Sequence, residues 1–341
     1  MSTVEIMTVW IRADGSAEIG LGHVMRCISI GEAVDPSRST VEFVTAADPV
    51  TQAILPKLPF SPTVIASSDS LDWMTRVAPG DWVLFDGNHF SDREFRRASE
   101  CGARVAVVDD TGQGEFRVDI LISPDRISAS EYQTKPGAAL LLGAEFALVR
   151  REFRRVRRLR PNSDTDSRKP ITSNNRGLRL AVVLGGTDAF RIGESVARTL
   201  ADSGRNDQVV LICGPGSKSL GGANSCDGIS MVHDPPDIAG VFDAMDLVIS
   251  AAGNTAWELA CMGMPTILIP LTEDQRNVAS IVEVSGAGLV IEPEAMDTTK
   301  FVTYLNRMDD PEVRLGMSRM ALGLVDGFGP LRIAEALLEE A

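Results

Sequence analysis

The chain has 341 residues, of which 44% are hydrophobic and 5% aromatic, and its formal net charge at pH 7 is −14. This length predicts about two domains, and the composition is typical of a globular protein in water. The acidic balance argues against a nucleic-acid partner, which would need a basic face. It still allows a local basic pocket for a nucleotide.

The N-terminus does not resemble a secretory signal peptide, because Glu5 follows Met1 closely and no long apolar stretch comes after it. No apolar run approaches the roughly 18 residues that a membrane span needs. The five cysteines are scattered and form no C-x-x-C pair, which predicts reduced thiols rather than disulfides or zinc. We therefore expect a cytoplasmic protein with no integral membrane segment, no metal and no cofactor.

The first half opens on an apolar strand, and a glycine-rich turn then leads into a helix over 22–34. Gly20 and Gly22 let the backbone approach a ligand closely, and the free N–H groups at the helix start suit phosphate. Met25 stands where the dinucleotide fingerprint G-x-G-x-x-G needs its third glycine, so that motif fails. His23 lies at the turn and is a candidate acid or base, with a purely structural role as the alternative.

Strands and helices alternate along the rest of the first half, which predicts a parallel sheet with helices on both faces. The expected strands are 8–12, 41–45, 82–86, 104–108 and 120–123, and a second helix is expected over 91–100.

An arginine-rich segment and a polar segment follow. Residues 150–160 predict a solvated amphipathic helix with Phe153, Val156 and Leu159 inward, which we favour over a membrane or nucleic-acid role. The polar residues that follow contain two prolines and predict a linker. The expected domains are 1–160 and 179–341, joined by the linker 161–178. The last helix is a candidate to pack back on the first domain.

The second half repeats the alternation, with expected strands over 179–184, 208–213, 247–250 and 266–270. Two such halves predict a ligand cleft between them, at the carboxyl ends of the strands. Glycines and hydroxyls at helix starts suit a diphosphate, and four turns carry them, namely 185–188, 213–217, 250–258 and 272–277. Glu258 lies one helical turn beyond Asn254 and Thr255, where a carboxylate can accept both hydroxyls of a ribose. The alternatives are a helix cap for Thr255 and a surface salt bridge for Glu258.

The segment 250–266 and the two-domain layout resemble the GT-B superfamily and its UDP-GlcNAc-using members similar to MurG. The opening segment 12–27 is similar to that of the PseG family, whose members hydrolyse UDP-2,4-diacetamido-2,4,6-trideoxy-β-L-altropyranose on the way to pseudaminic acid. The likeness covers nearly the whole chain and includes 142–150, 184–188, 214–216 and 326–333. It implies an α/β fold of the GT-B type, with two Rossmann-like domains and a cleft between them. The first domain would carry the catalytic histidine and the second would bind UDP.

The resemblance also implies roles for matching residues. His23 matches the histidine that activates a water for attack on the anomeric carbon, and Asp14 matches an acidic residue near the sugar. Both are candidate catalytic residues. The positions implied to bind the UDP-linked sugar are Gly20, Gly22, Asp86, Asn88, Gly186, Thr187, Gly214, Gly253, Asn254, Thr255, Glu258, Gln275 and Asn277. The family needs no metal.

Two loops depart from the family pattern. Asn88 stands where a tyrosine is usual, and Ser123-Pro-Asp-Arg126 replaces an Asn-Gln-Asn-like loop. Both loops face the sugar in the family, so the departures bear on the sugar more than on UDP. His89 is a candidate sugar contact with surface placement as the alternative. His233 is expected in a loop, either structural or near the uracil edge.

The leading hypothesis is hydrolysis of a UDP-activated amino- or deoxysugar. The alternative is a glycosyltransferase of the same fold, for a polysaccharide or a secondary metabolite, because one fold can host both activities. A third hypothesis is a nucleotide-sugar-binding subunit without activity. The first domain shows no clear membrane-docking patch, which slightly favours hydrolysis. The sequence leaves the oligomeric state open, with a monomer among the options.

Overall fold

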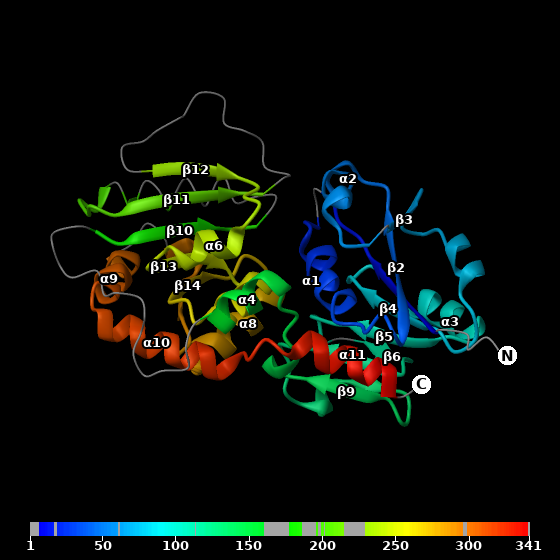
Figure 1. The fold of residues 1–341 in the computed structure, drawn as a ribbon. Coiled ribbons are helices and arrows are strands. Elements are labelled where there is room, and N and C mark those ends of the chain that lie inside the picture. Colours follow the sequence, from blue (N-terminus) through cyan, green and yellow to red (C-terminus); the bar gives the residue numbers. More distant parts are fainter. Residues whose placement is uncertain are drawn as a thin grey trace. The chain divides into compact units, whose positions relative to one another are not determined.

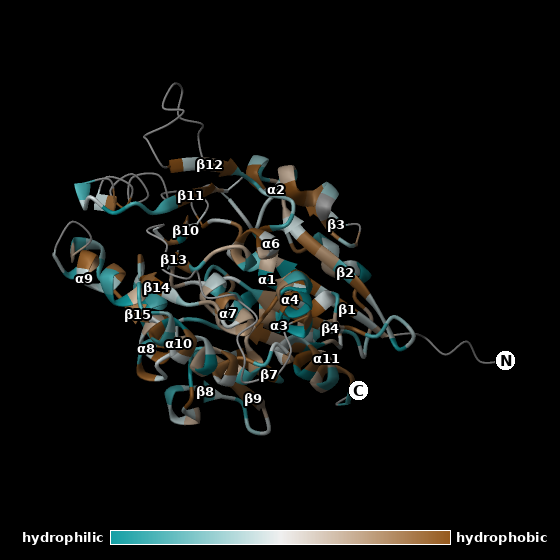
Figure 2. Cartoon of the chain, turned by 60° about the vertical axis from the view of Figure 1, so that its left-hand side comes forward, coloured by the Kyte–Doolittle hydropathy of each residue, from teal (hydrophilic) through white to brown (hydrophobic). Residues whose placement is uncertain are grey.

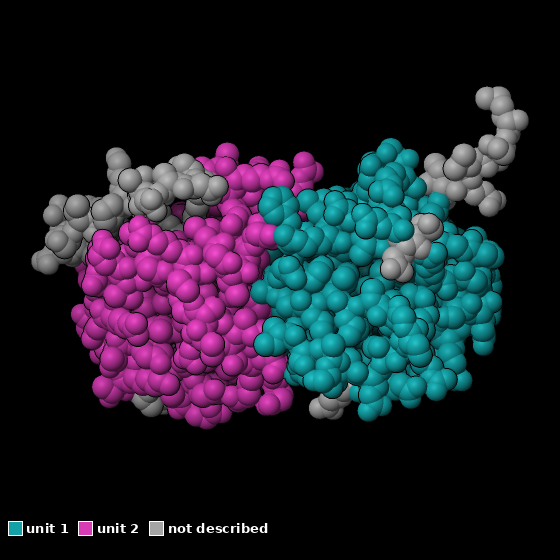
Figure 3. Space-filling model, turned by 90° about the horizontal axis from the view of Figure 1, so that it is seen from below, with its two compact units in different colours: residues 1–150, 327–341 teal, residues 151–326 magenta. Residues whose placement is uncertain are grey.

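The structure is a computed structural model. It describes residues 7–16, 19–60, 62–112, 114–159, 177–185, 196, 199–200, 202–214, 229–295 and 299–339. The chain divides into two compact units, unit 1 with residues 1–150 and 327–341 and unit 2 with residues 151–326 (Figure 3). Each unit is built on a parallel sheet covered by helices (Figure 1).

Unit 1 contains a seven-stranded sheet of order β3-β2-β1-β4-β5-β7-β9, in which every neighbouring pair is parallel. Its strands are β1 (Met7–Ala13), β2 (Ser39–Ala46), β3 (Pro62–Ile65), β4 (Trp82–Asp86), β5 (Arg104–Val108), β7 (Ile120–Ser123) and β9 (Ala139–Leu142), and β6 (Glu115–Phe116) pairs separately with β8 (Gln133–Thr134). Its helices are α1 (Gly22–Gly31), α2 (Pro49–Ile54), α3 (Asp92–Glu100) and α11 (Gly329–Glu339), with short 3-10 helices η1 (Leu55–Lys57), η2 (Asp72–Arg76), η3 (Ala129–Glu131) and η4 (Ala144–Phe146).

Strand β1 is the centre of unit 1. Val9 and Ile11 face a core shared with α1 and α11, while Trp10 faces the opposite core with Phe95 of α3. A strand buried on both faces is typical of a parallel sheet covered on both sides. The chain runs outward from β1 to β2 and β3 and then returns to place β4 on the other side of β1. The carboxyl ends of β1 and β4 therefore form a topological switch point, where ligands of open α/β sheets bind.

Unit 2 contains a six-stranded parallel sheet of order β12-β11-β10-β13-β14-β15. Its strands are β10 (Arg179–Val183), β11 (Gln208–Cys213), β12 (Ile229–His233), β13 (Leu247–Ala251), β14 (Thr266–Ile269) and β15 (Leu289–Val290). Its helices are α4 (Arg151–Leu159), α6 (Ile238–Asp243), α7 (Asn254–Met262), α8 (Glu273–Val284), α9 (Thr299–Met308) and α10 (Pro311–Leu324), with the 3-10 helix η5 (Pro293–Ala295). The strand order reverses between β10 and β13, so unit 2 has a switch point of its own.

The helices bury one face each. In α9 the buried residues are Phe301, Leu305 and Met308, at the spacing of one helical stripe. Brown and teal residues accordingly alternate along this helix in Figure 2. No helix among the described residues is both long and apolar enough to cross a membrane.

The predicted central strands are confirmed. Strands β4, β5, β7 and β11 have the expected limits, and the helix expected over 22–34 ends at Gly31. The sequence analysis missed β3, β9, β12 and β15, the edge strands of the two sheets. His233 was expected in a loop but is the last residue of β12, where it pairs with Cys213 in the register of β11. The predicted linker falls almost wholly outside the described residues.

The prediction for α4 was right for two residues and wrong for the third. Phe153 is 0% and Val156 7% exposed, but Leu159 is 76% exposed. Leu159 is six positions beyond Phe153, about 240° around the helix, which puts it on another face. Arg157 continues the inward face instead, because its guanidinium donates to the carbonyl oxygens of Cys261, Leu322 and Val325 at 3.0, 3.1 and 2.8 Å.

This assignment predicts unequal effects for two truncations in α4. Phe153→Ala should lower the free energy of unfolding of unit 2 by about 3–5 kcal/mol, because it leaves a cavity in the core. Leu159→Ala should change it by less than about 0.5 kcal/mol. Denaturation followed by the fluorescence of Trp257, the only tryptophan in unit 2, measures both. Equal losses would place Leu159 in the core.

Candidate functional site

The glycine turn after β1 sets the start of α1. Ser16 and Gly20 exchange two backbone hydrogen bonds of 3.2 and 2.9 Å. Gly20 has a φ of +75°, a conformation that glycine adopts without strain. A Cβ on Gly20 or Gly22 would meet no described atom within 4 Å, so the predicted glycines border open space. The turn delivers His23 as the second residue of α1, at the carboxyl end of β1.

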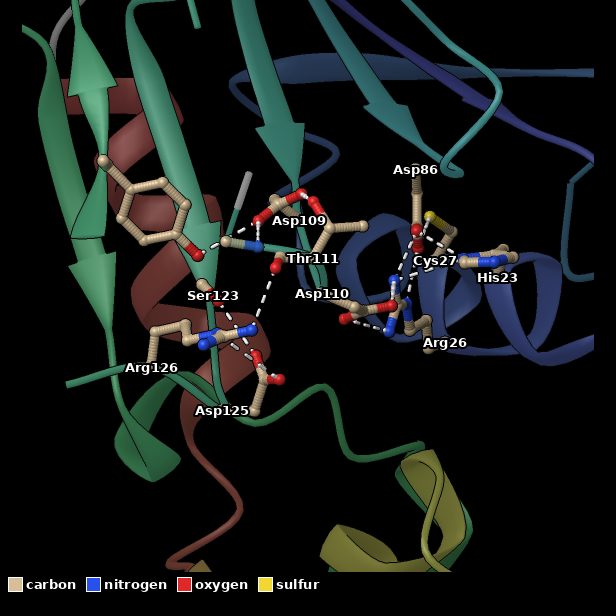
Figure 4. A network of polar contacts seen from close by, with 12 residues as sticks. His23, Arg26, Cys27, Asp86, Asp109, Asp110, Thr111, Ser123, Asp125 and Arg126 are labelled. Atoms are coloured by element: carbon tan, nitrogen blue, oxygen red, sulfur yellow. Dashed lines mark hydrogen bonds and ion pairs between the residues drawn. The ribbon is translucent and has the colours of Figure 1, made fainter. Parts of the chain in front are cut away.

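His23 is held by a buried carboxylate on the neighbouring strand. Its Nδ1 lies 2.7 Å from Oδ1 of Asp86, the last residue of β4, which is 0% exposed. Arg26, one helical turn beyond His23, donates to both oxygens of Asp86 at 2.6 and 2.7 Å. The same guanidinium donates to both oxygens of Asp110 at 2.9 and 2.7 Å. Figure 4 shows these side chains gathered where β1, β4 and β5 end.

Asp86 is held ionised at this site. Burial alone would raise the pKa of Asp86, but the charges of Arg26 and His23, together with their hydrogen bonds, keep it well below its ordinary value. An ionised carboxylate only accepts hydrogen bonds, so Nδ1 of His23 donates to Asp86, and Nε2 is the nitrogen that holds the free lone pair in the neutral ring. The arrangement leaves an oriented imidazole that can accept a proton from a bound hydroxyl.

Cys27 completes this group but is not a nucleophile. Its Sγ donates to Oδ2 of Asp86 at 3.2 Å. Burial, and next the charge of Asp86, raises the pKa of the Cys27 thiol well above its ordinary value. A protonated, buried thiol is inert, and we assign Cys27 to holding Asp86.

Asp14 lies beyond β1 and is bonded on both oxygens. It accepts from the backbone N–H of Ala46 at 2.6 Å and from Arg12, whose Nη2 is 2.7 Å from Oδ2. Nε2 of His89 lies 2.9 Å from the same Oδ2. Burial would raise the pKa of Asp14, but hydrogen bonds from His89 and Arg12 and the charge of Arg12 hold it well below its ordinary value. Asp14 is 3% exposed, so its surroundings are protein groups.

The loops that depart from the family pattern also end at this edge. Asn88 is exposed after β4. Ser123 donates to Oδ1 of Asp125 at 2.9 Å, while Oδ2 is buried without a hydrogen-bond partner. Burial, and next the charge of Asp110, raises the pKa of Asp125 to about 6.

Sequence reasoning missed Arg26, Asp110 and Asp125. Arg26 lies three residues after His23 on one helix face, a spacing that could have indicated a shared partner. Asp110 and Asp125 follow predicted strands, at the edge where ligands of parallel sheets bind. Among the described residues, no group of three or more His, Cys, Asp or Glu side chains is placed to hold a metal ion.

In unit 2 the structure brings the turn after β13 next to the start of α8. Gly253 is the N-cap of α7, and Asn254 and Thr255 are its first two residues. A Cβ on Gly253 would lie 3.8 Å from Nε2 of Gln275, whose Oε1 accepts from the backbone N–H of Leu271 at 2.9 Å. Gln275 therefore braces the chain beside the N-terminus of α7.

The alternative roles given in the sequence analysis to Thr255, a helix cap, and to Glu258, a surface salt bridge, are wrong. Thr255 is not the cap, because Gly253 takes that position. Glu258 is not on the surface, since it is 1% exposed. Asn277 is half-buried on α8 and Gly214 follows β11. Gly186 and Thr187 lie outside the described residues.

Comparisons with known proteins agree with this architecture. Residues 180–323 match the glycosyltransferase family 28 C-terminal domain. The chain is 30% identical over 177 residues to the UDP-N-acetylglucosamine--N-acetylmuramyl-(pentapeptide) pyrophosphoryl-undecaprenol N-acetylglucosamine transferase of Cutibacterium acnes, covering 48% of this chain and 46% of that protein. An uncharacterized protein of Methanocaldococcus jannaschii is 20% identical over 287 residues, covering 80% of this chain and 57% of that one. The chain thus spans about half the length of these relatives.

Solved structures show the fold. MurG of Acinetobacter baumannii superposes with a TM-score of 0.63 at 14% identity, covering 98% of this chain and 99% of that chain. The spinosyn forosaminyltransferase SpnP gives 0.63 at 12% identity with the same coverage. The chain has the α/β GT-B fold, and its second unit carries a family 28 C-terminal domain.

The position of Asp125 predicts a pH-dependent stability. The folded state keeps this proton up to about pH 6, whereas an unfolded aspartate loses it near the ordinary value of 3.8. The stability that the folded state gains by keeping this proton is therefore fully present below pH 3.8 and is lost as the pH rises to about 6. Between them the free energy of unfolding of wild type should fall relative to Asp125→Asn by about 1 kcal/mol per pH unit. Urea denaturation from pH 4.5 to 7.5 measures both proteins, and parallel curves would contradict the assignment.

Proposed function

We propose that this protein is an enzyme that transfers a sugar from a UDP-linked donor, with His23 as the general base. One observation carries the proposal: a partly exposed imidazole is oriented by a buried, ionised carboxylate at the switch point of unit 1. The UDP-linked donor is supported by the family 28 domain in unit 2 and by the UDP-N-acetylglucosamine transferase named among the relatives.

The reaction follows from the orientation of the ring. Nε2 of His23 takes the proton of an incoming hydroxyl as its oxygen forms a bond to the anomeric carbon. The bond from that carbon to the diphosphate oxygen breaks, and UDP leaves with the electron pair. The imidazolium formed at His23 is stabilised by Asp86 through Nδ1. The diphosphate needs no proton to leave if its charge is met by helix N-termini.

We assign the nucleotide to unit 2. The turn after β13 ends in Gly253, whose lack of a side chain exposes the first N–H groups of the nine-residue helix α7. Asn254 and Thr255 would add polar contacts to the diphosphate, with Gln275 beside them. Glu258, one turn further along α7 and 1% exposed, is assigned to the ribose hydroxyls by resemblance. Gly186, Thr187, Gly214 and Asn277 remain assigned to the donor by resemblance alone.

A second candidate has water as the acceptor. The opening segment 12–27 favours it, because this PseG-like segment supplies His23, Arg26 and Cys27 to the array around Asp86. The donor would then be UDP-2,4-diacetamido-2,4,6-trideoxy-β-L-altropyranose, in a pseudaminic acid-type pathway. Both candidates use the same base and break the same kind of bond, and they differ in the donor sugar and in the hydroxyl that attacks.

The role of His23 is tested by His23→Asn. The asparagine amide takes the place of Nδ1, so it can still donate to Asp86, but it offers no basic nitrogen. We expect UDP release to slow by about 100-fold or more, as for loss of a general base. UDP affinity measured by calorimetry should stay within about twofold. Unchanged turnover would remove His23 from the chemistry.

The acceptor is tested with wild type and the altropyranose donor. UDP release in buffer alone assigns the hydrolase. Release that requires the pyrophosphoryl-undecaprenol-linked N-acetylmuramyl pentapeptide, or another added alcohol, assigns the transferase. UDP binding without release from this donor or from UDP-N-acetylglucosamine, with or without acceptor, contradicts both candidates.

The ribose assignment predicts a loss of selectivity in Glu258→Gln. Wild type should bind UDP about tenfold more tightly than 2′-deoxy-UDP, because a hydroxyl bonded to a charged group is lost in the analogue. The variant should bind the two nucleotides about equally. Calorimetry on proteins with matched thermal unfolding checks this, and a variant that still prefers UDP removes Glu258 from the ribose.

A further inference from the structure

Unit 1 contains the same three-residue group twice. In the first triad Arg26 and His23 both bind Asp86. In the second triad Arg12 and His89 both bind Asp14. Each triad consists of a guanidinium, a buried carboxylate and an imidazole. The proposed reaction uses the first triad and leaves the second without a role.

The two triads cross between neighbouring strands. In the register of β1 and β4, Ala13 is opposite Asp86, so Asp14 lies one residue beyond that pair. His23 follows β1 but binds the aspartate of β4, whereas His89 follows β4 but binds the aspartate after β1. The two imidazoles therefore come to the same edge of the sheet, at its switch point.

In each triad the imidazole is more accessible than the carboxylate. The side chains of His23 and His89 are 18% and 34% exposed, whereas those of Asp86 and Asp14 are 0% and 4% exposed. Both carboxylates are ionised, and each is partnered by an arginine. A ligand at this edge would therefore meet the imidazole rings before the two buried carboxylates.

The ring of His89 is fixed by its neighbours. It packs on Phe90 with 4.0 Å between ring centroids, and the guanidinium of Arg12 lies 4.8 Å from the Phe90 ring. Gly87 has a φ of +148°, and a Cβ there would lie 2.7 Å from Cε1 and 2.9 Å from Nδ1 of His89, so a glycine keeps the space beside this edge of the ring free. The loop thus requires a glycine at this position for the ring to reach Asp14.

The two histidines bind their aspartates through opposite nitrogens. His23 uses Nδ1 and leaves Nε2, while His89 uses Nε2 and leaves Nδ1. Within the described residues, Nδ1 of His89 has no hydrogen-bond partner. Because Nε2 donates to an ionised carboxylate, Nδ1 is the acceptor of the neutral ring. Its partner must be an O–H or N–H group, not a carbonyl or phosphate oxygen.

We infer that His89 is a specificity-determining residue that accepts a hydrogen bond from a hydroxyl or amide N–H of the donor sugar, with Asp14 as its positioning residue. The inference rests on the proposed function, because it takes the sugar to be bound at the edge that carries His23. It gives the buried Asp14 a role, which is to position His89. It also makes the loop 87–90 one of the segments that determine which sugar is bound.

Two amide variants separate contact with the sugar from support of Asp14. In His89→Gln the amide takes the place of Nε2, so the contact to Asp14 is kept and the outward acceptor is lost. In His89→Asn the amide oxygen can take the place of Nδ1, so the outward acceptor is kept and the Asp14 contact is lost. The probes are UDP, UDP-N-acetylglucosamine, UDP-glucose and the UDP-linked altropyranose. Calorimetry on the full-length chain gives the affinity of each UDP-sugar relative to UDP.

For the UDP-sugar that wild type binds best, His89→Gln should lower the affinity relative to UDP about five- to tenfold, the loss of one hydrogen bond. His89→Asn keeps the acceptor but loses its contact with Asp14, so its affinity should fall less, by about two- to threefold. UDP itself should bind all three proteins equally, since it is assigned to unit 2.

The opposite pattern overturns the inference, because it would show that His89 only supports Asp14. Equal effects of the two variants, whether both bind like wild type or both are impaired, overturn it too. If wild type binds none of the UDP-sugars more tightly than UDP, the inference is contradicted. The proposed function stands in that case if UDP release from a UDP-sugar is still measured. Wild type that binds no UDP contradicts the proposed function first.

Discussion

The buried carboxylate of Asp86 is the constraint on which unit 1 depends. It ends a strand that is covered on both faces, where an unpaired charge would cost several kcal/mol. Arg26, His23 and Cys27 all come from α1 and all bind this one group. The position of α1 over the sheet and the orientation of the proposed base are therefore set by the same contacts. Replacing one of these three residues by one that binds the carboxylate less well would disturb both the position of α1 and the orientation of His23.

Much of the fold follows from the sequence because the central strands are buried on both faces. Runs such as Trp82–Asp86 and Arg104–Val108 are short, apolar and bounded by turns, which predicts buried strands. The missed strands lie at sheet edges, where burial is incomplete: Leu289 and Val290 of β15 are both half-buried. A two-residue edge strand such as β15 does not stand out from a loop, whereas β9 is an apolar run that the sequence analysis did not assign.

The candidate site was predictable only where its residues are close in the sequence. His23 was found from one glycine turn, and Asp86 by resemblance. The pairing of Arg26 with Asp110 joins residues 84 positions apart and depends on the order β1-β4-β5. Alternation of strands and helices predicts a parallel sheet but not the order of its strands. The pairing of Asp14 with His89 follows from that strand order. The sequence analysis therefore assigned Asp14 to the sugar without its partner His89.

The groups around Asp86 in unit 1 suit the proposed proton transfer. Asp86, Asp110 and Asp125 lie at one edge, and Arg26 is shared by the first two. At this edge the oriented His23 can bind a hydroxyl and receive its proton. The leaving group then needs its own stabilisation, which the helix N-terminus after Gly253 can supply. The same base serves water or an alcohol, so the choice between hydrolysis and transfer depends on which hydroxyl fits beside His23.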